Sequence, residues 1–167
     1  MGFEFKCTTC GEIHRGIPTF SADKPLSYFD LPEKERDERC DCGEDYCVID
    51  GKWFFVRWCI EIYVHNEEYP FIWGVWVSLS RVNYHKLIES FDMEKRSHIS
   101  PFFGWLNAWF KPYPNTVNLK NRVYLRDKRT KPDIEIESTD HPLAVEQRKG
   151  ISKDRVAEIY SIMMHGK

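Results

Sequence analysis

Two long stretches of alternating apolar residues constrain the fold of this chain more than any other feature. Every second residue from Phe54 to Val64 is apolar, and the same holds from Phe71 to Leu79. Side chains along a β-strand point alternately to the two faces of a sheet, so each stretch predicts a strand with one buried face. The polar turn at 65–68 is short, and short links join antiparallel strands. We therefore expect a central antiparallel sheet.

A hairpin is expected to precede the first of these strands. Asp50-Gly51 suits a type I′ turn, because both central residues of that turn need positive φ. The turn joins apolar residues 47–49 to residues 52–56. After the second strand, Ser80 is placed to cap a helix with apolar residues at helical spacing.

Two helices are expected to close the chain. Asp140 or His141 can cap the first, which Gly150 ends, and Ser152 can cap the second. These elements predict an α+β fold: a central antiparallel sheet, C-terminal helices packed on it, and a cysteine-rich, zinc-knuckle-like N-terminal lobe. We expect a single domain over 1–167, with the lobe at 1–46, the sheet core with one or two inserted helices at 47–138, and the C-terminal helices at 139–167.

The charge of the chain argues against one class of partner. Its 24 Lys and Arg nearly balance its 26 Asp and Glu, which leaves a net charge of −2. This balance gives no long-range attraction for phosphate backbones, so nucleic-acid binding is not expected. No apolar stretch reaches the ~18 residues of a membrane span, and no signal peptide is visible. We expect a cytoplasmic protein that does not enter membranes.

Two clusters of cysteines in the first third of the chain indicate a metal site. Cys7 and Cys10 are separated by two residues and followed by Gly11, which is the spacing of a zinc knuckle. Its tight turn lets both thiolates reach one ion at ~2.3 Å. Cys40 and Cys42 form the second cluster, and in a reducing cytoplasm such cysteines are more often ligands than disulfides. The sequence therefore predicts a closed structural Zn²⁺ site of Cys7, Cys10, Cys40 and Cys42.

Other assignments of these residues stay open. The second cluster has one residue between its cysteines where a knuckle has two, so Cys47 or His14 is a substitute ligand. Free thiols are the alternative to a metal site, and a redox dithiol at the first cluster lacks the βαβ context of thioredoxin-like proteins. Cys59 lies in a predicted strand and is expected to be a small buried apolar side chain.

Asp140-His141 invites a catalytic interpretation, as a hydrolase or metal-dependent enzyme that uses His141 with a nearby Cys or acidic residue. The sequence shows no third residue whose spacing would identify it as the group that orients the histidine. The start of a helix explains the Asp140-His141 pair with fewer assumptions. The other histidines form no HxH or HxxxH pair, so we expect no catalytic metal site. They are His65, His85, His98 and His165.

A basic segment and an aromatic group are the remaining candidates for a binding surface. The basic residues are Lys120, Arg122, Arg126, Lys128, Arg129 and Lys131. Stacking of single-stranded nucleic acid needs interleaved aromatics, and only Tyr124 is available, so a solvated edge or a contact for an acidic partner is expected. Trp105 and Trp109 are spaced one helical turn apart, which favours core packing, and any exposed part would be a docking site.

Several motifs, taken in order, resemble a family of bacterial proteins. They are Cys7-x-x-Cys10-Gly11-x-x-His14, Cys47-Val48-Ile49-Asp50-Gly51, the run from Trp73 to Ser80, Gly104-Trp105-Leu106, and the run from Thr139 to Ala144. Over nearly the whole chain they resemble domain-of-unknown-function family number 2199. The resemblance implies a bacterial protein that forms one complete domain, and it carries over no reaction. Members often lack cysteines at the places of Cys42 and Cys59, which favours Cys47 and His14 as ligands.

These observations lead us to expect a non-enzymatic, zinc-stabilised module that binds another protein. An immunity or accessory protein for a partner toxin is one concrete version. Near-neutral charge with segregated acidic and basic segments fits this function, as does the lack of a catalytic motif. The alternative is the enzyme built on His141.

Overall fold

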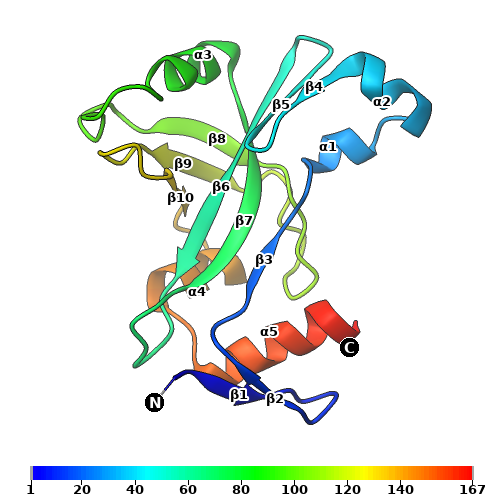
Figure 1. Cartoon of the computed structure of the whole chain (residues 1–167), viewed down its shortest axis with the longest axis vertical. Coiled ribbons are helices and arrows are strands. Elements are labelled where there is room, and N and C mark those ends of the chain that lie inside the picture. Colours follow the sequence, from blue (N-terminus) through cyan, green and yellow to red (C-terminus); the bar gives the residue numbers. More distant parts are fainter. Residues whose placement is uncertain (1, 167) are drawn as a thin grey trace.

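The computed structural model describes residues 2–166, and its centre is a closed five-stranded β-barrel (Figure 1). The barrel strands are β6 (Trp53–Ile62), β7 (Phe71–Leu79), β8 (Phe102–Leu106), β9 (Lys120–Tyr124) and β10 (Asp133–Ile136). Consecutive strands pair antiparallel, but β10 pairs parallel with β6 and so closes the ring. The fold is of the mixed α/β class. The expectation of a central antiparallel sheet needs correction, because the sheet closes into a barrel through a parallel pair.

Three short strands extend the barrel. β5 (Tyr46–Ile49) pairs with β6, and β4 (Cys40–Cys42) pairs with β5. β3 (Thr19–Ser21) adds to β7 in the parallel direction. The helices α1 (Leu26–Phe29) and α2 (Glu33–Arg39) lie beside this extension, and α3 (Arg81–Glu89) connects β7 to β8 (Figure 1).

Local signals in the sequence are confirmed at the turns and caps. Asp50 and Gly51 both have positive φ, 54° and 59°, at the β5–β6 hairpin. The Ser80 side chain accepts a hydrogen bond from the N–H of Asn83 at the start of α3. These features depend on neighbours in the sequence alone, which is why a local pattern is enough to find them.

The alternation along β6 and β7 separates two apolar cores. Side chains of one face fill the barrel, where Val56, Ile60 and Trp73 are fully buried. Phe55 and Trp76 point outward and pack under α1 and β4 in a second, smaller core. Both faces of this part of the sheet are therefore buried, and β4, β5 and α1 are held against the barrel.

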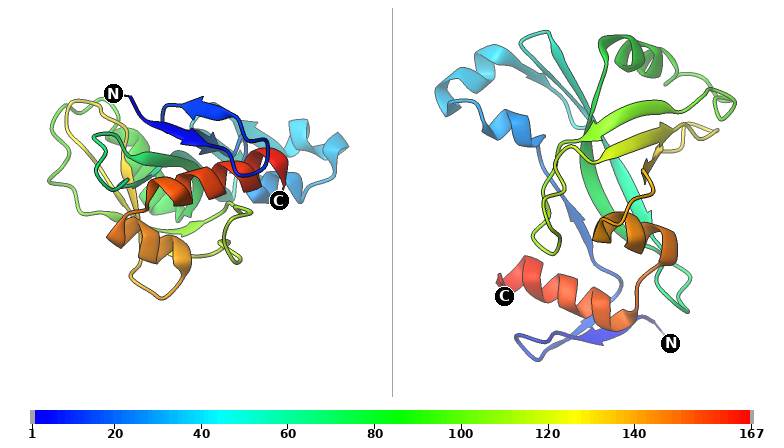
Figure 2. Two further views of the ribbon diagram at one scale, coloured as in Figure 1. Left: turned by 90° about the horizontal axis from the view of Figure 1, so that it is seen from below. Right: turned by 180° about the vertical axis from the view of Figure 1, so that it is seen from behind.

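The first and last elements of the chain meet at one end of the molecule. β1 (Glu4–Lys6) and β2 (Ile13–Arg15) form a separate antiparallel hairpin, which lies along α5 (Lys153–His165) in Figures 1 and 2. α4 (Pro142–Lys149) leads into α5 from the barrel. The parts of the expected N-terminal lobe at 1–46 are separated in space: this hairpin forms its own sheet, and it lies toward the opposite end of the long axis from β4 (Figure 1).

Candidate metal centre

The turn between β1 and β2 presents Cys7 and Cys10. The Cys7 N–H donates to the carbonyl of Glu12 at 2.9 Å, and the Gly11 N–H donates to the carbonyl of Cys7 at 3.0 Å. Gly11 has φ +75°, a conformation that glycine adopts without steric cost. Cys7 is buried and Cys10 is exposed, so the pair lies at the boundary between the hairpin and solvent.

Two groups of metal-ligating side chains share Cys10. Cys7, Cys10 and His165 have ligand atoms within 4.8 Å of one another, and so do Cys10, Glu12 and His14. The Sγ of Cys10 is 3.7 Å from the Nε2 of His14. Thiolate sulfur and imidazole nitrogen are the donors that Zn²⁺ prefers in structural sites. The knuckle cysteines therefore gather histidines from β2 and from the end of α5.

The electrostatics of Cys7 suit a metal ligand. Hydrogen bonds lower the pKa of its thiol to about 7: the backbone N–H of Cys10 contributes most, and the side chain of His165 also contributes. A lowered pKa favours the thiolate, which is the form that binds metal. His14 was expected as a substitute ligand, whereas His165 was grouped with the histidines that form no HxH or HxxxH pair, and no motif spacing connects it to the knuckle.

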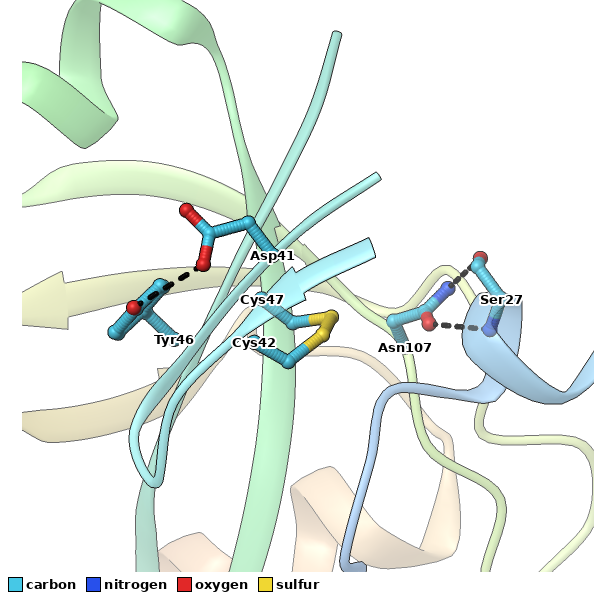
Figure 3. Close-up of a disulfide and its surroundings, with 6 residues drawn as sticks. All are labelled: Ser27, Asp41, Cys42, Tyr46, Cys47 and Asn107. Atoms are coloured by element: carbon cyan, nitrogen blue, oxygen red, sulfur yellow. Dashed lines mark hydrogen bonds between the residues drawn. A yellow bond between two sulfur atoms is a disulfide. The ribbon is translucent and has the colours of Figure 1, made fainter. Parts of the chain in front are cut away.

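The second cysteine cluster does not join this centre, which corrects the expected set of four thiolates. Among residues 2–166, no group of three or more close metal ligands contains Cys40, Cys42 or Cys47. Cys42 faces Cys47 across the β4–β5 pair, and the two form a disulfide (Figure 3). Cys40 is a free thiol whose pKa is raised, chiefly by burial. These three cysteines belong to the small core outside the barrel.

The surroundings of Cys59 and His141 fit structural roles for both side chains. Cys59 is a half-buried free thiol on β6, and burial raises its pKa, which keeps it protonated. The Nδ1 of His141 accepts a hydrogen bond from the N–H of Leu143 at 3.1 Å and caps α4. A neutral ring that accepts at Nδ1 carries its proton on Nε2, and that atom is buried without a partner. His141 in this state has no free lone pair with which to act as a base.

A second candidate surface lies on the outside of the barrel, and we call it the aromatic–basic face. It consists of Phe103, Trp105, Lys120, Arg122 and Tyr124. The strand register places Phe103 opposite Arg122 and Trp105 opposite Lys120. The aromatic side chains are 39%, 40% and 38% exposed in chain order, and neither cation forms an ion pair within the described part of the chain.

This face corrects the expectation that the aromatic group packs in the core. Trp105 lies on β8 instead of a helix, and its outward direction follows from strand alternation. Trp109 is 55% exposed in the following loop, whereas Phe110 and Tyr113 are buried. Pairing of β8 with β9 supplies the interleaved aromatics that the basic segment lacks in the linear sequence. A hollow of about 290 Å³ lies beside this face, with Glu135 and Glu137 on its other wall.

Comparison with known proteins identifies a family but assigns no reaction to it. No helix among residues 2–166 has the length and apolar character needed to cross a membrane. Neither a curated protein nor a solved structure matches the chain. A family model matches residues 6–151, a region that includes Cys7, Cys10 and His14 and stops before His165. The chain belongs to this family, DUF2199, described as an uncharacterized protein conserved in bacteria.

Proposed function

We propose that this chain is a non-enzymatic module that binds another protein through the aromatic–basic face and is stabilised by a structural Zn²⁺ ion at the knuckle. The observation that carries the binding role is the exposure of Phe103, Trp105 and Tyr124 side by side on strands of a closed barrel. Aromatic side chains on a rigid surface supply a large contact area at a small cost in conformational entropy.

The charges around this face favour a protein over a nucleic acid. Lys120 lies over the ring of Trp105, with its Nζ 5.8 Å from the ring centroid, and Arg122 lies beside Phe103. Trp, Tyr and Arg are the residues that dominate the binding energy of protein interfaces. Glu135 lies opposite Arg122 on β10, so the face lacks the continuous positive charge that a nucleic-acid backbone needs. We therefore propose a partner that presents carboxylates to the two cations and apolar side chains to the rings.

The knuckle supports a structural ion and not a catalytic one. If two thiolates and two imidazoles coordinate the Zn²⁺ ion, its tetrahedral coordination is complete and no position is left for water or substrate. The cap that His141 provides for α4 supports a structural role for this residue in place of the catalytic one. An immunity or accessory protein that neutralises a partner toxin is the role we propose for such a module.

The test compares two pairs of exposed side chains on different faces. The double variant Trp105→Ser, Lys120→Glu removes the centre of the aromatic–basic face. Trp53 and Lys52 form a matched control, because Trp53 is 56% exposed and Lys52 Nζ lies 5.4 Å from its ring centroid. Tagged wild-type protein and both double variants are used to capture partners from lysate of the native bacterium. We expect a partner that is recovered with wild type and with Trp53→Ser, Lys52→Glu and is lost with the face variant. Equal recovery with all three proteins, or no specific partner, contradicts the proposal.

A further inference from the structure

The side chains around the knuckle point to a specific set of ligands for the metal ion. This inference rests on the structural ion of the proposed function and deepens it. We propose that one Zn²⁺ ion is coordinated by Cys7, Cys10, His14 and His165, and that it fastens the N-terminal hairpin to the last turn of α5. The site is thus built from both ends of the chain.

Cys10 belongs to both groups of donor atoms. In a tetrahedral site, two ligands at ~2.0–2.3 Å from Zn²⁺ lie roughly 3.3–3.8 Å apart. The separation of 3.7 Å between Cys10 Sγ and His14 Nε2 fits this spacing, and the ligand atoms of Cys7, Cys10 and His165 lie within 4.8 Å of one another. Because both groups contain Cys10, we place the ion beside its Sγ, with one imidazole from each group.

His14 is a better fourth donor than its neighbour Glu12. The His14 ring is half-buried, with its centroid 4.4 Å from that of Tyr160 and 5.4 Å from that of Phe5. Packing on both rings fixes the imidazole before metal binds, so little side-chain freedom is lost on coordination. Glu12 is exposed and has no such packing, and carboxylate oxygen is a harder donor than the imidazole that accompanies thiolates in structural zinc sites.

His165 is held at the site by the way α5 ends. It is the last residue of the helix, and Gly166 follows with φ 72° in the left-handed conformation that terminates helices. The N–H of Gly166 donates to the carbonyl of Ile162, which keeps the last turn closed and presents the His165 ring. The Tyr160 ring packs near both histidines, with its centroid 4.4 Å from that of His14 and 6.4 Å from that of His165.

Such an ion would make up for the small size of the hairpin. β1 and β2 have three residues each, and a two-stranded hairpin is marginally stable by itself. Its contacts with α5 include the Phe5–Tyr160 ring pair at 5.2 Å and a hydrogen bond between the hydroxyls of Thr9 and Ser161. An ion bound to three ligands of the hairpin and to His165 of α5 would turn these contacts into one fixed unit.

Cobalt spectroscopy of the full chain tests the ligand set. Co²⁺ replaces Zn²⁺ in tetrahedral sites and reports its ligands through visible d–d bands and near-ultraviolet sulfur-to-cobalt charge transfer. The variants are His165→Ala, His14→Ala and Cys10→Ser, and Glu12→Gln is the matched control. All four positions are exposed or half-buried, so the variants are expected to fold, which circular dichroism checks. Zinc affinity is measured by competition with a chromophoric chelator.

We expect wild type and Glu12→Gln to show the same strong tetrahedral spectrum and the same zinc affinity. Cys10→Ser should lose about half of the charge-transfer intensity, because one of two thiolates is gone. Each histidine variant should keep the charge transfer, change the d–d bands, and lose more than the ~10–100-fold in affinity that follows loss of an outer-shell partner. Unchanged spectra and affinity in His165→Ala or His14→Ala would overturn this ligand set while leaving a structural metal in place. Failure of wild type to bind any metal would overturn both the ligand set and the structural ion.

Discussion

Cys7 and His165, near the two ends of the chain, bring ligand atoms to within 4.8 Å of each other and of Cys10. The tertiary structure creates this relationship, because β1, at the start of the chain, lies along α5, at its end (Figure 2). A metal ion at this place would connect the two ends of the chain.

Removal of the metal should therefore loosen both chain ends together. On addition of a strong chelator, we expect amide hydrogen exchange to accelerate in β1, in β2 and in the last turn of α5. Exchange in β6 and β7 should stay slow, because their hydrogen bonds lie in the barrel. Hydrogen exchange with mass spectrometry measures all regions in one experiment. Uniform acceleration, or acceleration in the hairpin alone, would show that the ion does not join hairpin to helix.

The barrel was only partly predictable from the sequence. The alternation along β6 and β7 and the Asp50-Gly51 turn are local patterns, and both elements were found. Closure of the sheet depends on the parallel pairing of β10 with β6, for which the register has a single partner pair, Asp133 with Cys59. A contact between strands so far apart in sequence leaves no periodic signal, so only an antiparallel sheet was expected and its closure was missed.

The barrel seam between β7 and β8 depends on the absence of a side chain at Gly104. A Cβ at this position would lie 2.3 Å from Val77 Cγ1 and 3.0 Å from the carbonyl oxygen of Ser78. We expect Gly104→Ala to destabilise the protein by about 1–3 kcal/mol, the usual range for an overpacked core. Urea unfolding followed by tryptophan fluorescence measures the change. Gly2→Ala is the control, because a Cβ there meets no atom within 4 Å, and equal stability of the two variants would contradict the packing at the seam.

The role of His141 as a cap predicts a difference between two substitutions. His141→Ala removes the acceptor for the Leu143 N–H and should cost about 0.5–2 kcal/mol in the free energy of unfolding. His141→Asn keeps a side-chain acceptor at the N-cap and should recover most of this loss. Thermal unfolding of both variants measures the effect. If the two variants are equally destabilised, the imidazole has a role other than capping.

Acid should weaken the contact between Asp127 and residues 96–97. The N–H groups of Ser97 and Arg96 and the hydroxyl of Ser97 donate to the Asp127 carboxylate, and they lower its pKa. A carboxylate with a lowered folded-state pKa contributes stability above its unfolded value of ~3.9, and the contribution is lost as the pH falls through the folded value. We expect Asp127→Asn to be less stable than wild type at neutral pH and to approach it in acid. Chemical unfolding at several pH values measures this difference, and a gap independent of pH would show that the charge is not involved.

The candidate sites show the same limit of sequence reasoning. The Cys7–Cys10 spacing led to the first two candidate metal ligands, and His14 was within reach as a neighbour in sequence. Cys40 and Cys42 were a reasonable second pair by spacing, but β4 carries them into the core beside α1, where Cys42 meets Cys47. Trp105 and Lys120 come from different strands, so their contact on the aromatic–basic face follows from the β8–β9 register and not from a motif.

Native mass spectrometry of the chain, purified without chelator or affinity metal, counts the zinc ions that each variant holds. We expect one zinc ion per chain in wild type, retention of that ion in Glu12→Gln, and its loss in the double variant Cys10→Ser, His165→Ala. Wild-type protein that is fully folded and metal-free, or a double variant that still holds its ion, would contradict a zinc site shared by the two ends of the chain.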